Sequence, residues 1–534
     1  MRSFNKITLY LIPVVLLLSA LLHVMLPAEA DKGWLLHVAR MGLEGRKLYV
    51  GIIEVNPPLI VWLYTIPVWI SMHVNGLQDF EALGLIGLAF SLMSVAVCEC
   101  LIRLHPAFAG NVRDQVRFMV LLLLVIIFYT TQIYFFDRDH IFLVFTLPYM
   151  LRFMPSLAER KLPLWLRCAV GCMGAVGFCI KPHTIIVFII LQLFAIRHTR
   201  SISVLWRLEN CIIAAGGLLY LLCIWHFTPE YLSVIMPMAL ATYSQFGNKS
   251  TGYIYLPPAV VSAGLIFADF RVWYVTPYRR DVYYFMMICV AFLVYAMAQN
   301  GWGYTYNPLY CVLLLTTGWM MWEYTWLKRD HEERGLPAKR FNFGMRGCYI
   351  VFLMQAMYMA AYLVVMLFSL DTIRSPCEGQ KDCWQAGPYV QYLRKHEVHS
   401  FGTISLDFSN WVLLMRLTGA QWDTRFNHLW MMPKLVKSSP ADAAKNRWIL
   451  EFVAKGYAQD LQERKPQLIL VDSSPGFAGH SPPVNFLAVL GVVPAFKEAW
   501  RHYQYAETLG ICSTHLGSDV VASECRYDAY VRIP

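Results

Sequence analysis

The feature that most constrains this chain is a series of long apolar runs, each bounded by charged or turn-forming residues. The run from Ile7 to Leu26 is about 20 residues long, the length of helix that crosses a bilayer. Hydrophobic residues make up 57% of the 534 residues and charged residues only 15%, and the mean hydropathy is +0.45. Soluble globular proteins of this size rarely have such a composition. The sequence therefore predicts a polytopic membrane protein.

The formal net charge of +10 has a different meaning in a membrane protein than in a soluble one. In a soluble chain it would favour nucleic acid as a partner, whereas membrane proteins collect Lys and Arg in their cytoplasmic loops. Basic stretches such as "RFMPSLAERKLPLWLR" and "LKRDHEERGLPAKRFNFGMR" are assigned to the inside on this rule. The result is about eleven transmembrane helices in the inner (cytoplasmic) membrane, an inner N-terminus, an outer C-terminus and no nucleic-acid partner. Expected spans include Ala82–Leu101, Phe118–Phe135 and Gly347–Leu370.

The N-terminus leaves two interpretations open. Its basic residues, its apolar run and an Ala-x-Ala-like end are also typical of a cleaved signal peptide. The length of the run from Ile7 to Leu26 favours a retained first helix, because the apolar part of a signal peptide is shorter.

The composition changes near residue 371, which predicts two domains. Residues 1–370 form a transmembrane domain whose long first outer loop, 28–81, contains short interfacial helices. Residues 371–534 alternate strand-like runs such as "QLILVD" and "YDAYVRI" with a helix-like run, "NRWILEFVAKGYAQDLQER". The predicted fold is thus a mainly α polytopic membrane protein with a C-terminal extracytoplasmic (periplasmic) α/β domain.

The 14 cysteines fall into two groups. Ten lie in or beside apolar segments without metal-like spacing and are most simply small buried hydrophobes. The other four lie in the C-terminal region, where an extracytoplasmic location favours disulfides. The simplest pairing, which the sequence does not fix, is Cys377 with Cys383 and Cys512 with Cys525.

Sorting polar residues by predicted side gathers acids, a lysine and histidines on the outer face. The stretch "YFFDRDHIFLVF" places Asp137, Arg138, Asp139 and His140 there, at a helix end. At mid-bilayer each charge would cost about 2.5 to 3.5 kcal/mol on insertion scales, so this position is much less expensive. Such a convergence of polar groups at the membrane surface is the material of an active site. The same face also receives Asp31, Glu44, Glu54, Asn56, Lys181, His183, Gln299 and Asn300.

Four of these outer segments resemble those of the C-class (GT-C) membrane glycosyltransferases, which include the protein O-mannosyltransferases and the lipid A aminoarabinose transferases. The segment "DKGWLLHVARMGLEGRKLYVGIIEVNPPLIVWL" opens with the acid Asp31 and ends in Asn56, Pro57, Pro58 and Leu59, as the first outer loop of that family does. The second acidic position of the family falls on 137–139, and its short lysine turn falls on Lys181 and Pro182. The late segment "NGWGYTYNP" also matches, but many relatives carry a histidine near Tyr304 to Tyr306 and this chain has none.

The resemblance, which covers about 370 residues, implies transfer of a sugar, hexosyl or pentosyl, from a polyprenyl-phosphate donor to an acceptor at the outer face. Asp31 would be the general base that takes the proton of the acceptor hydroxyl. Lys181 and Arg138 would stabilise the departing polyprenyl phosphate. A base on one face of the sugar and a leaving group on the other imply inversion at the anomeric carbon.

The remaining site predictions concern supporting residues. Asp139, with His140, would orient the acceptor, stabilise the developing positive charge, or hold a divalent cation, and the sequence does not choose among these roles. Glu54, Asn56 and Tyr304 are predicted to contact substrate. The acceptor is a glycolipid, a glycan or a protein.

Structural roles remain possible for several of these residues. Asp31 would then be an interfacial anchor, Glu54 a helix cap, Lys181 a lysine reaching the headgroups, and Asp137 a partner of Arg138. Two other kinds of function also remain: a secondary transporter, and a non-catalytic sensor or assembly protein whose outer domain binds a partner. Transporters place acids near the bilayer midplane in two related halves, a pattern that this chain lacks.

Overall fold

The structure is a computed structural model that describes residues 30–128, 135–158, 160–243, 279–299, 303–334, 387–406, 411–436, 439–473, 484–512 and 525–533, with single helical residues at 21, 24, 350, 353 and 357. It divides into two compact units. The first comprises Met1–Pro27, Ile70–Cys223 and Lys249–Leu367, and the second Ala28–Trp69, Ile224–Asn248 and Phe368–Pro534. The predicted first and last spans lie almost entirely outside the described residues. Cys377 and Cys383 also lie outside them.

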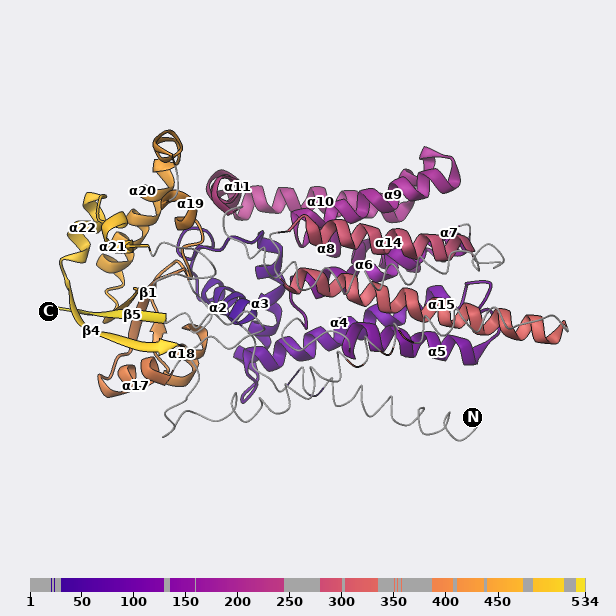
Figure 1. Ribbon diagram of the computed structural model, residues 1–534, viewed down its shortest axis with the longest axis horizontal. Coiled ribbons are helices and arrows are strands. Elements are labelled where there is room, and N and C mark those ends of the chain that lie inside the picture. The colour runs from indigo at the N-terminus through magenta and orange to yellow at the C-terminus, as the bar shows by residue number, and fades with distance from the viewer. Residues whose placement is uncertain are drawn as a thin grey trace. The chain divides into compact units, whose positions relative to one another are not determined.

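The first unit is a bundle of long helices (Figure 1). In chain order its elements are α4 (Asp79–Ile102), α5 (Val112–Leu123), the π-helix η1 (Leu124–Phe128), α6 (Arg138–Arg152), α7 (Pro155–Ala158), α8 (Leu164–Cys179), the 3-10 helix η2 (Pro182–Thr184), α9 (Ile185–Thr199), η3 (Ile202–Trp206), most of α10 (Leu208–Phe227), α14 (Arg279–Met297), η6 (Gly303–Tyr306) and α15 (Asn307–Glu333).

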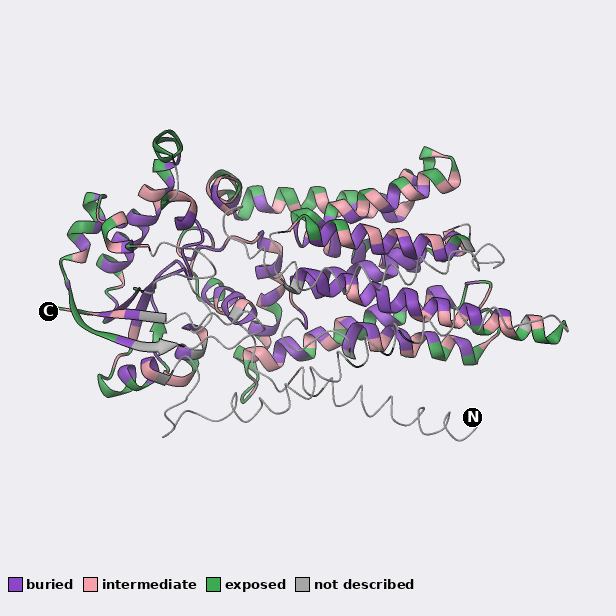
Figure 2. Cartoon of the chain, in the orientation of Figure 1, coloured by how far each residue is buried: buried purple, intermediate pink, exposed green. Residues whose placement is uncertain are grey.

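Four helical segments of the described chain are long and apolar enough to cross a membrane: Asp79–Ile102, Pro182–Thr199, Leu208–Phe227 and Arg280–Met297. On α10 and α9, large apolar side chains such as Leu218, Leu222 and Leu193 are exposed, and Figure 2 shows little burial along the outer side of α10. Side chains of this kind are favourable on a surface that faces lipid rather than water.

Helix α6 is the buried centre of this unit. Every residue from Arg138 to Arg152 is buried, and the helix is uniformly coloured as buried in Figure 2. It packs against α4, where the Ser94 hydroxyl donates to the Val144 carbonyl at 2.6 Å. It also packs against α8, where Gly177 lies so close that a Cβ atom would stand 2.5 Å from Cγ2 of Thr146. Residues at the first turn of α6 are therefore held in a rigid frame.

Three segments predicted to lie inside meet at one end of this bundle. Asp281 accepts hydrogen bonds from the Ser156 amide at 2.9 Å and the Ser156 hydroxyl at 2.5 Å, and its carboxylate lies 3.1 Å from Nε2 of His105. His105 and Asp281 are fully buried. These contacts hold together the ends of α4, α7 and α14.

The second unit joins the first loop to the C-terminal region. Its five-stranded sheet has the order β2-β1-β3-β5-β4, in which β2, β1 and β3 are parallel and β5 is antiparallel to both β3 and β4. The strands are β1 (Ser400–Ile404), β2 (Gln421–Trp422), β3 (Leu468–Asp472), β4 (Tyr503–Cys512) and β5 (Cys525–Arg532). The helical elements are α2 (Ala30–Leu43), most of α3 (Pro58–His73), the π-helix η4 (Tyr231–Ile235), α11 (Met236–Thr242), α17 (Gly387–Lys395), α18 (Trp411–Thr418), α19 (Met432–Val436), α20 (Pro440–Glu463), α21 (Phe486–Leu490) and α22 (Pro494–Trp500).

The coarse fold prediction is confirmed, since the chain is mostly helical and its C-terminal part carries a small mixed sheet. The count of about eleven spans stays a prediction. The two units divide the chain differently from the two predicted domains, because 28–69 and 224–248 group with the C-terminal region. The domain limits and the outer location of the C-terminal region likewise stay predictions.

Candidate active site

The first turn of α6 is fixed by hydrogen bonds to its backbone. Asp137 is the N-cap, and its carboxylate accepts a bond from the His140 amide at 2.8 Å. The His140 ring is fully buried: Nδ1 accepts from the Phe136 amide at 2.9 Å, and Nε2 lies 2.9 Å from the Ile126 carbonyl. Nε2 therefore carries the proton and donates it to that carbonyl. Asp137 caps the helix, and His140 ties it to the preceding π-helix.

Asp139 and Lys181 form a buried ion pair beside this turn. The Lys181 Nζ atom lies 2.5 Å from Oδ2 of Asp139, and the two side chains are 8% and 1% exposed. The Tyr295 hydroxyl donates to Oδ1 of Asp139 at 2.6 Å. Lys181 also donates to Oε1 of Gln299 at 3.2 Å. Three segments, the start of α6, the turn before η2 and the end of α14, thus place four polar groups together.

One more polar group lies beside this pair. The Nε2 atom of Gln299 is buried and makes no hydrogen bond of good geometry to a described residue, and it lies within reach of the Tyr295 hydroxyl. Beside the cation of Lys181, this amide would also be a donor to an anionic oxygen.

In the second unit, Glu54 fixes the end of the first loop. Its carboxylate is 2% exposed and accepts bonds from Trp34 Nε1 at 2.5 Å, from the Asn56 amide at 2.8 Å and from Asn56 Nδ2 at 2.5 Å. The Tyr49 hydroxyl donates to the Asn56 carbonyl at 2.6 Å. These bonds hold the residues directly before Pro57 and Pro58. Asp31 lies half-buried in the first turn of α2.

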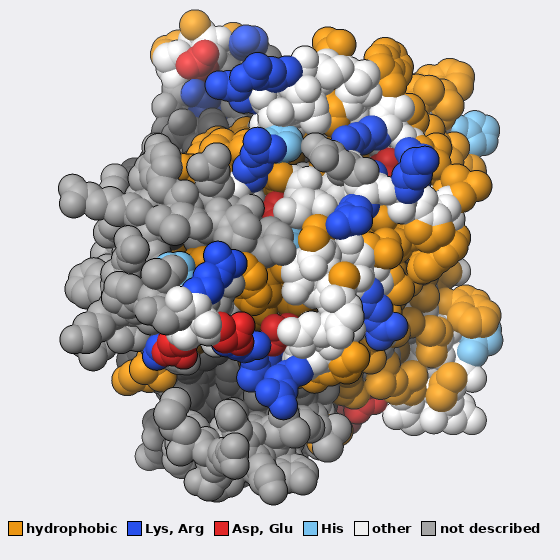
Figure 3. All heavy atoms as spheres, turned by 90° about the vertical axis from the view of Figure 1, so that its right-hand side faces the viewer, with side chains coloured by type: hydrophobic (Ala, Val, Ile, Leu, Met, Phe, Trp, Pro, Cys, Tyr) orange, Lys and Arg blue, Asp and Glu red, His pale blue; other side chains and the backbone are white. Residues whose placement is uncertain are grey.

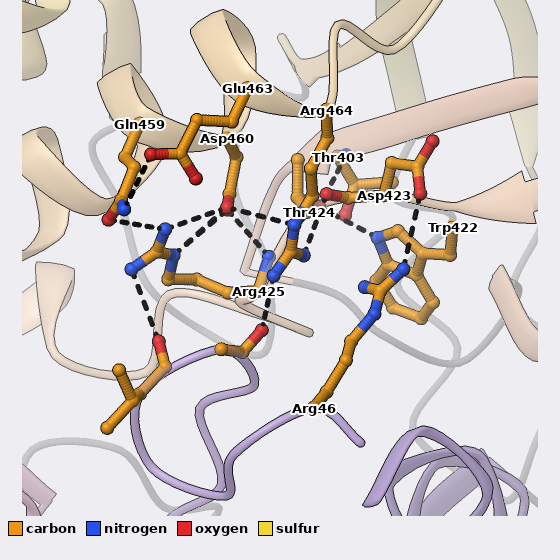
Figure 4. Close-up of polar contacts among 12 residues, drawn as sticks. Arg46, Thr403, Trp422, Asp423, Thr424, Arg425, Gln459, Asp460, Glu463 and Arg464 are labelled. Carbon is orange, nitrogen blue, oxygen red and sulfur yellow. Dashed lines mark hydrogen bonds and ion pairs between the residues drawn. The ribbon is translucent and has the colours of Figure 1, made fainter. Parts of the chain in front are cut away.

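The same loop is fastened to the C-terminal region by arginines (Figure 4). Arg425 donates from Nη1 to the Val50 carbonyl at 3.2 Å, and Arg464 donates from Nη2 to the Gly51 carbonyl at 2.7 Å. Arg46 approaches Asp423 at 3.5 Å. Both Arg425 and Arg464 also pair with the buried Asp460, whose carboxylate lies between their guanidinium groups in Figure 4.

Burial and the facing arginines act in opposite directions on these carboxyl groups. Burial raises the pKa of Asp460, against the hydrogen bonds and charges of Arg425 and Arg464. Burial likewise raises the pKa of Asp423, against the charge of Arg46. The bonds that Asp460 accepts hold both arginines in the orientation that reaches the loop carbonyls.

The donor groups of Asp139 and His140 do not fit a divalent cation. Both ring nitrogens of His140 are engaged with backbone, and the Lys181 ammonium occupies the position beside Asp139, where a cation would have to displace it. Among the described residues no group of three or more His, Cys, Asp and Glu side chains gathers as a metal site would.

The predicted site residues thus fall into two sets. Arg138, which is buried, Asp139, His140 and Lys181 adjoin in the first unit, where Tyr304 lies in η6, whereas Asp31, Glu54 and Asn56 lie in the second. A joint site of the two sets stays a prediction.

Tyr295 was not foreseen from the sequence, because it lies within an apolar run. No local feature of the sequence distinguishes it from the other aromatic residues of that run.

Solved structures show a likeness over nearly the whole chain. ArnT from Cupriavidus metallidurans, a lipid A aminoarabinose transferase, matches in its apo state with a TM-score of 0.51 and 12% identity, over 99% of this chain and 98% of that one. The chain has the fold of the C-class membrane glycosyltransferases. This GT-C fold is the one that the resemblance of the outer segments implies.

Two further solved structures also resemble this chain. ArnT bound to undecaprenyl phosphate matches this GT-C-fold chain with the same TM-score of 0.51, identity of 12% and coverage of 99% and 98%. The archaeal oligosaccharyltransferase AglB from Archaeoglobus fulgidus, in complex with an inhibitory peptide and a dolichol-phosphate, matches with a TM-score of 0.42 and 10% identity, over 94% of this chain and 73% of that one. No protein-family model matches the sequence, and no curated protein matches it.

Proposed function

We propose that this chain is a membrane glycosyltransferase that moves a sugar from a polyprenyl-phosphate-linked donor to an acceptor at the outer face of the inner membrane. The observation that carries the proposal is the buried Asp139–Lys181 pair, with the side chain of Gln299 bonded to the same lysine. The shared fold supports it, because ArnT, which has that fold, is seen bound to undecaprenyl phosphate. The acceptor is a glycolipid, a glycan or a protein, and the sugar a hexose or a pentose.

Lys181 is the cation that would meet the donor phosphate. A buried ammonium is a strong partner for a phosphate oxygen, because little water screens it. Asp139 holds Lys181 in place through a short contact, and Tyr295 holds Asp139. When the bond between the anomeric carbon and the phosphate breaks, charge grows on the leaving oxygen. Lys181 and Nε2 of Gln299 would stabilise that charge, while Arg138 adds positive potential nearby.

Asp31 is the proposed general base. It would take the proton of the acceptor hydroxyl as that oxygen attacks the anomeric carbon from the face opposite the phosphate, which inverts the configuration. The bond from Trp34 on α2 to the buried Glu54 supports this role, because it holds the first turns of the helix that carries Asp31, and a catalytic base must keep its position through the reaction.

The test is transfer of radiolabelled sugar from polyprenyl phosphate by the full chain reconstituted in vesicles. We expect Asp31→Asn to lower kcat by roughly 10²- to 10⁴-fold, the range for a lost general base. Lys181→Gln should lower it by roughly 10²- to 10³-fold. Asp137→Asn is the matched control and should retain activity, because asparagine also caps helices well.

Different results would contradict the proposed base and the proposed enzymatic function. Full activity of Asp31→Asn would exclude the proposed base without excluding the enzyme. A wild-type chain that transfers no sugar from any polyprenyl-phosphate donor would exclude the proposed function and favour a sensor or assembly protein. Movement of labelled solute across the vesicle membrane, without transfer, would instead indicate a transporter.

A further inference from the structure

A groove opens in the first unit between the last turn of α9 and the first turns of α14, at the end of these helices remote from Lys181. Its volume is about 520 Å³. Apolar and aromatic side chains form its walls, and cationic side chains its rim. The residues lining it are Phe194, Arg197, His198, Arg200, Arg280, Tyr283, Met286, Met287 and Val290.

Within the part of the chain that the structure describes, the rim of the groove is formed by cations and lacks a facing acid. Arg197, Arg200 and Arg280 are all exposed, and the described residues that line the groove include no Asp or Glu. The nearest acid in sequence, Asp281, is fully buried and is engaged by His105 and Ser156. Figure 3 faces this end of the unit and shows Lys and Arg side chains distributed over it among apolar ones.

Favourable interaction with the helix dipole explains only some of the arginines at the rim. Arg197 and Arg200 lie at the C-terminal end of α9, where the helix dipole favours positive charge. Arg280 lies in the first turn of α14, where the dipole disfavours it. The arginines from the two helices nevertheless face one groove, which points to an external anion as their shared partner.

The position of the groove identifies the anion. Segment Pro182–Thr199 has 18 residues, and a helix of that length spans about 27 Å, close to the hydrocarbon thickness. Lys181 and Gln299 meet at one end of α9 and α14, so the groove lies at the opposite membrane face. The basic composition of the adjoining loops assigns that face to the cytoplasm. Apolar walls below a cationic rim then match a lipid with an anionic headgroup.

We propose that this groove binds an anionic phospholipid of the inner leaflet. Its phosphate lies between Arg197 and Arg280, and the upper part of one acyl chain lies against Met286 and Met287. The lipid would hold α9 and α14 together at the end where they are open. This binding is separate from sugar transfer, because the two sites lie at opposite ends of the helices.

The experiment is native mass spectrometry of the delipidated full chain titrated with phosphatidylglycerol or with phosphatidylcholine. We expect preferential binding of phosphatidylglycerol, and roughly 30-fold weaker binding by Arg197→Gln/Arg280→Gln. Each cation near an anionic lipid contributes about 1 kcal/mol, and every 1.4 kcal/mol is tenfold in affinity. The matched control is Arg113→Gln/Arg329→Gln, which removes two exposed cations from α5 and α15. It should bind as the wild type does.

Three results would overturn the proposal: equal binding of both lipids, unchanged binding by the α9–α14 double variant, or full competition by inorganic phosphate alone. Melting without lipid reports whether each variant is folded. If the double variant does not fold, Met287→Glu tests the same groove by placing a negative charge in its wall. Wild-type lipid binding by folded Met287→Glu would then contradict the proposal.

Discussion

Asp139 and Lys181 neutralise each other at a place where either charge alone would be expensive. Removing one partner of a buried ion pair leaves an uncompensated charge, which typically costs about 3 to 5 kcal/mol. Replacing both partners by neutral groups of similar size often costs far less. Stability and activity can therefore be separated at this pair.

We predict that Asp139→Asn and Lys181→Met will each lower the free energy of unfolding by about 3 to 5 kcal/mol, and that the double variant will lose much less than the sum. Denaturant unfolding in detergent measures the four species. The double variant should remain inactive in sugar transfer, because the cation that meets the phosphate is missing. Strictly additive losses of stability would show that the two groups do not interact.

The buried residue His428 makes the stability of the second unit depend on pH. Burial lowers the pKa of His428 to about 3, from an ordinary value near 6.5. Between these two values the unfolded chain binds a proton that the folded chain does not, so stability must fall as pH falls from about 6.5 toward 3.

We therefore predict that the melting temperature followed by tryptophan fluorescence will fall between pH 7 and pH 5, and that His428→Gln will reduce this slope. The exposed His502 supplies the control, since His502→Gln should leave the slope as it is. If His428→Gln has the same slope as the wild type, the protonation occurs elsewhere.

The polar residues at the site could be predicted only in part from the sequence. Sorting the loops by their basic residues predicted that Asp139 and Lys181 lie on the same membrane face, and in the structure the two residues form an ion pair. The partner Tyr295 is 156 residues from Asp139, and nothing local marks it as different from a membrane-belt aromatic. Likewise, the bond from Trp34 to Glu54 depends on how the first loop folds, which residue types alone do not specify.

Among the elements, the close contact between α6 and α8 is one at which a substitution can be tested. Gly177→Ala would place a Cβ atom 2.5 Å from Cγ2 and 3.2 Å from the backbone nitrogen of Thr146. Since α6 is buried along its whole length, it has little room to shift.

We predict that Gly177→Ala destabilises the chain by about 1 to 3 kcal/mol, as overpacking usually does. Gly217→Ala on α10 is the control, because its added Cβ meets only Cys179 Sγ at 3.9 Å. It should be neutral or slightly stabilising through helix propensity. Thermal unfolding in detergent distinguishes the two, and equal melting temperatures would show that α6 and α8 separate easily.

Elements with a clear period or turn signal were predictable, and irregular ones were not. The expected span Ala82–Leu101 is α4 to within a few residues, and "QLILVD" contains β3. The expected span Phe118–Phe135 is instead α5 followed by the π-helix η1, with 129–134 outside the described residues. The apolar letters of "LVIIF" carry no mark of a π-helix, because that geometry comes from packing.

At the scale of the whole molecule, the first loop and the C-terminal region form one unit, and Arg464 is a main connection. It donates to the Gly51 carbonyl at 2.7 Å and to the Asp423 carbonyl at 3.0 Å. No sequence pattern could reveal this link, since Arg464 and Gly51 are 413 positions apart. The ion-paired residues of the same loop and region, Arg46 and Asp423, are 377 positions apart.

We predict that Arg464→Met will speed hydrogen exchange at the amides of Tyr49, Gly51 and Ile53 by roughly 10- to 100-fold, the value of a lost hydrogen bond to a charged group. Arg447→Met is the control, because Arg447 makes an exposed pair with Glu451 on α20. Unchanged exchange in Arg464→Met would mean that the loop holds its shape without the C-terminal region.

The separation of Arg46 and Asp423 in the sequence also delays the folding of the first loop during synthesis. At roughly 5 to 20 residues per second, a ribosome that has made Arg46 needs about 20 to 75 s more to reach Asp423, 377 residues later. During that interval the loop can make none of its arginine contacts to the C-terminal region. The first loop is therefore translated early but reaches its final structure only after the C-terminal region has been made. A chain truncated before that region would carry a first loop without these contacts.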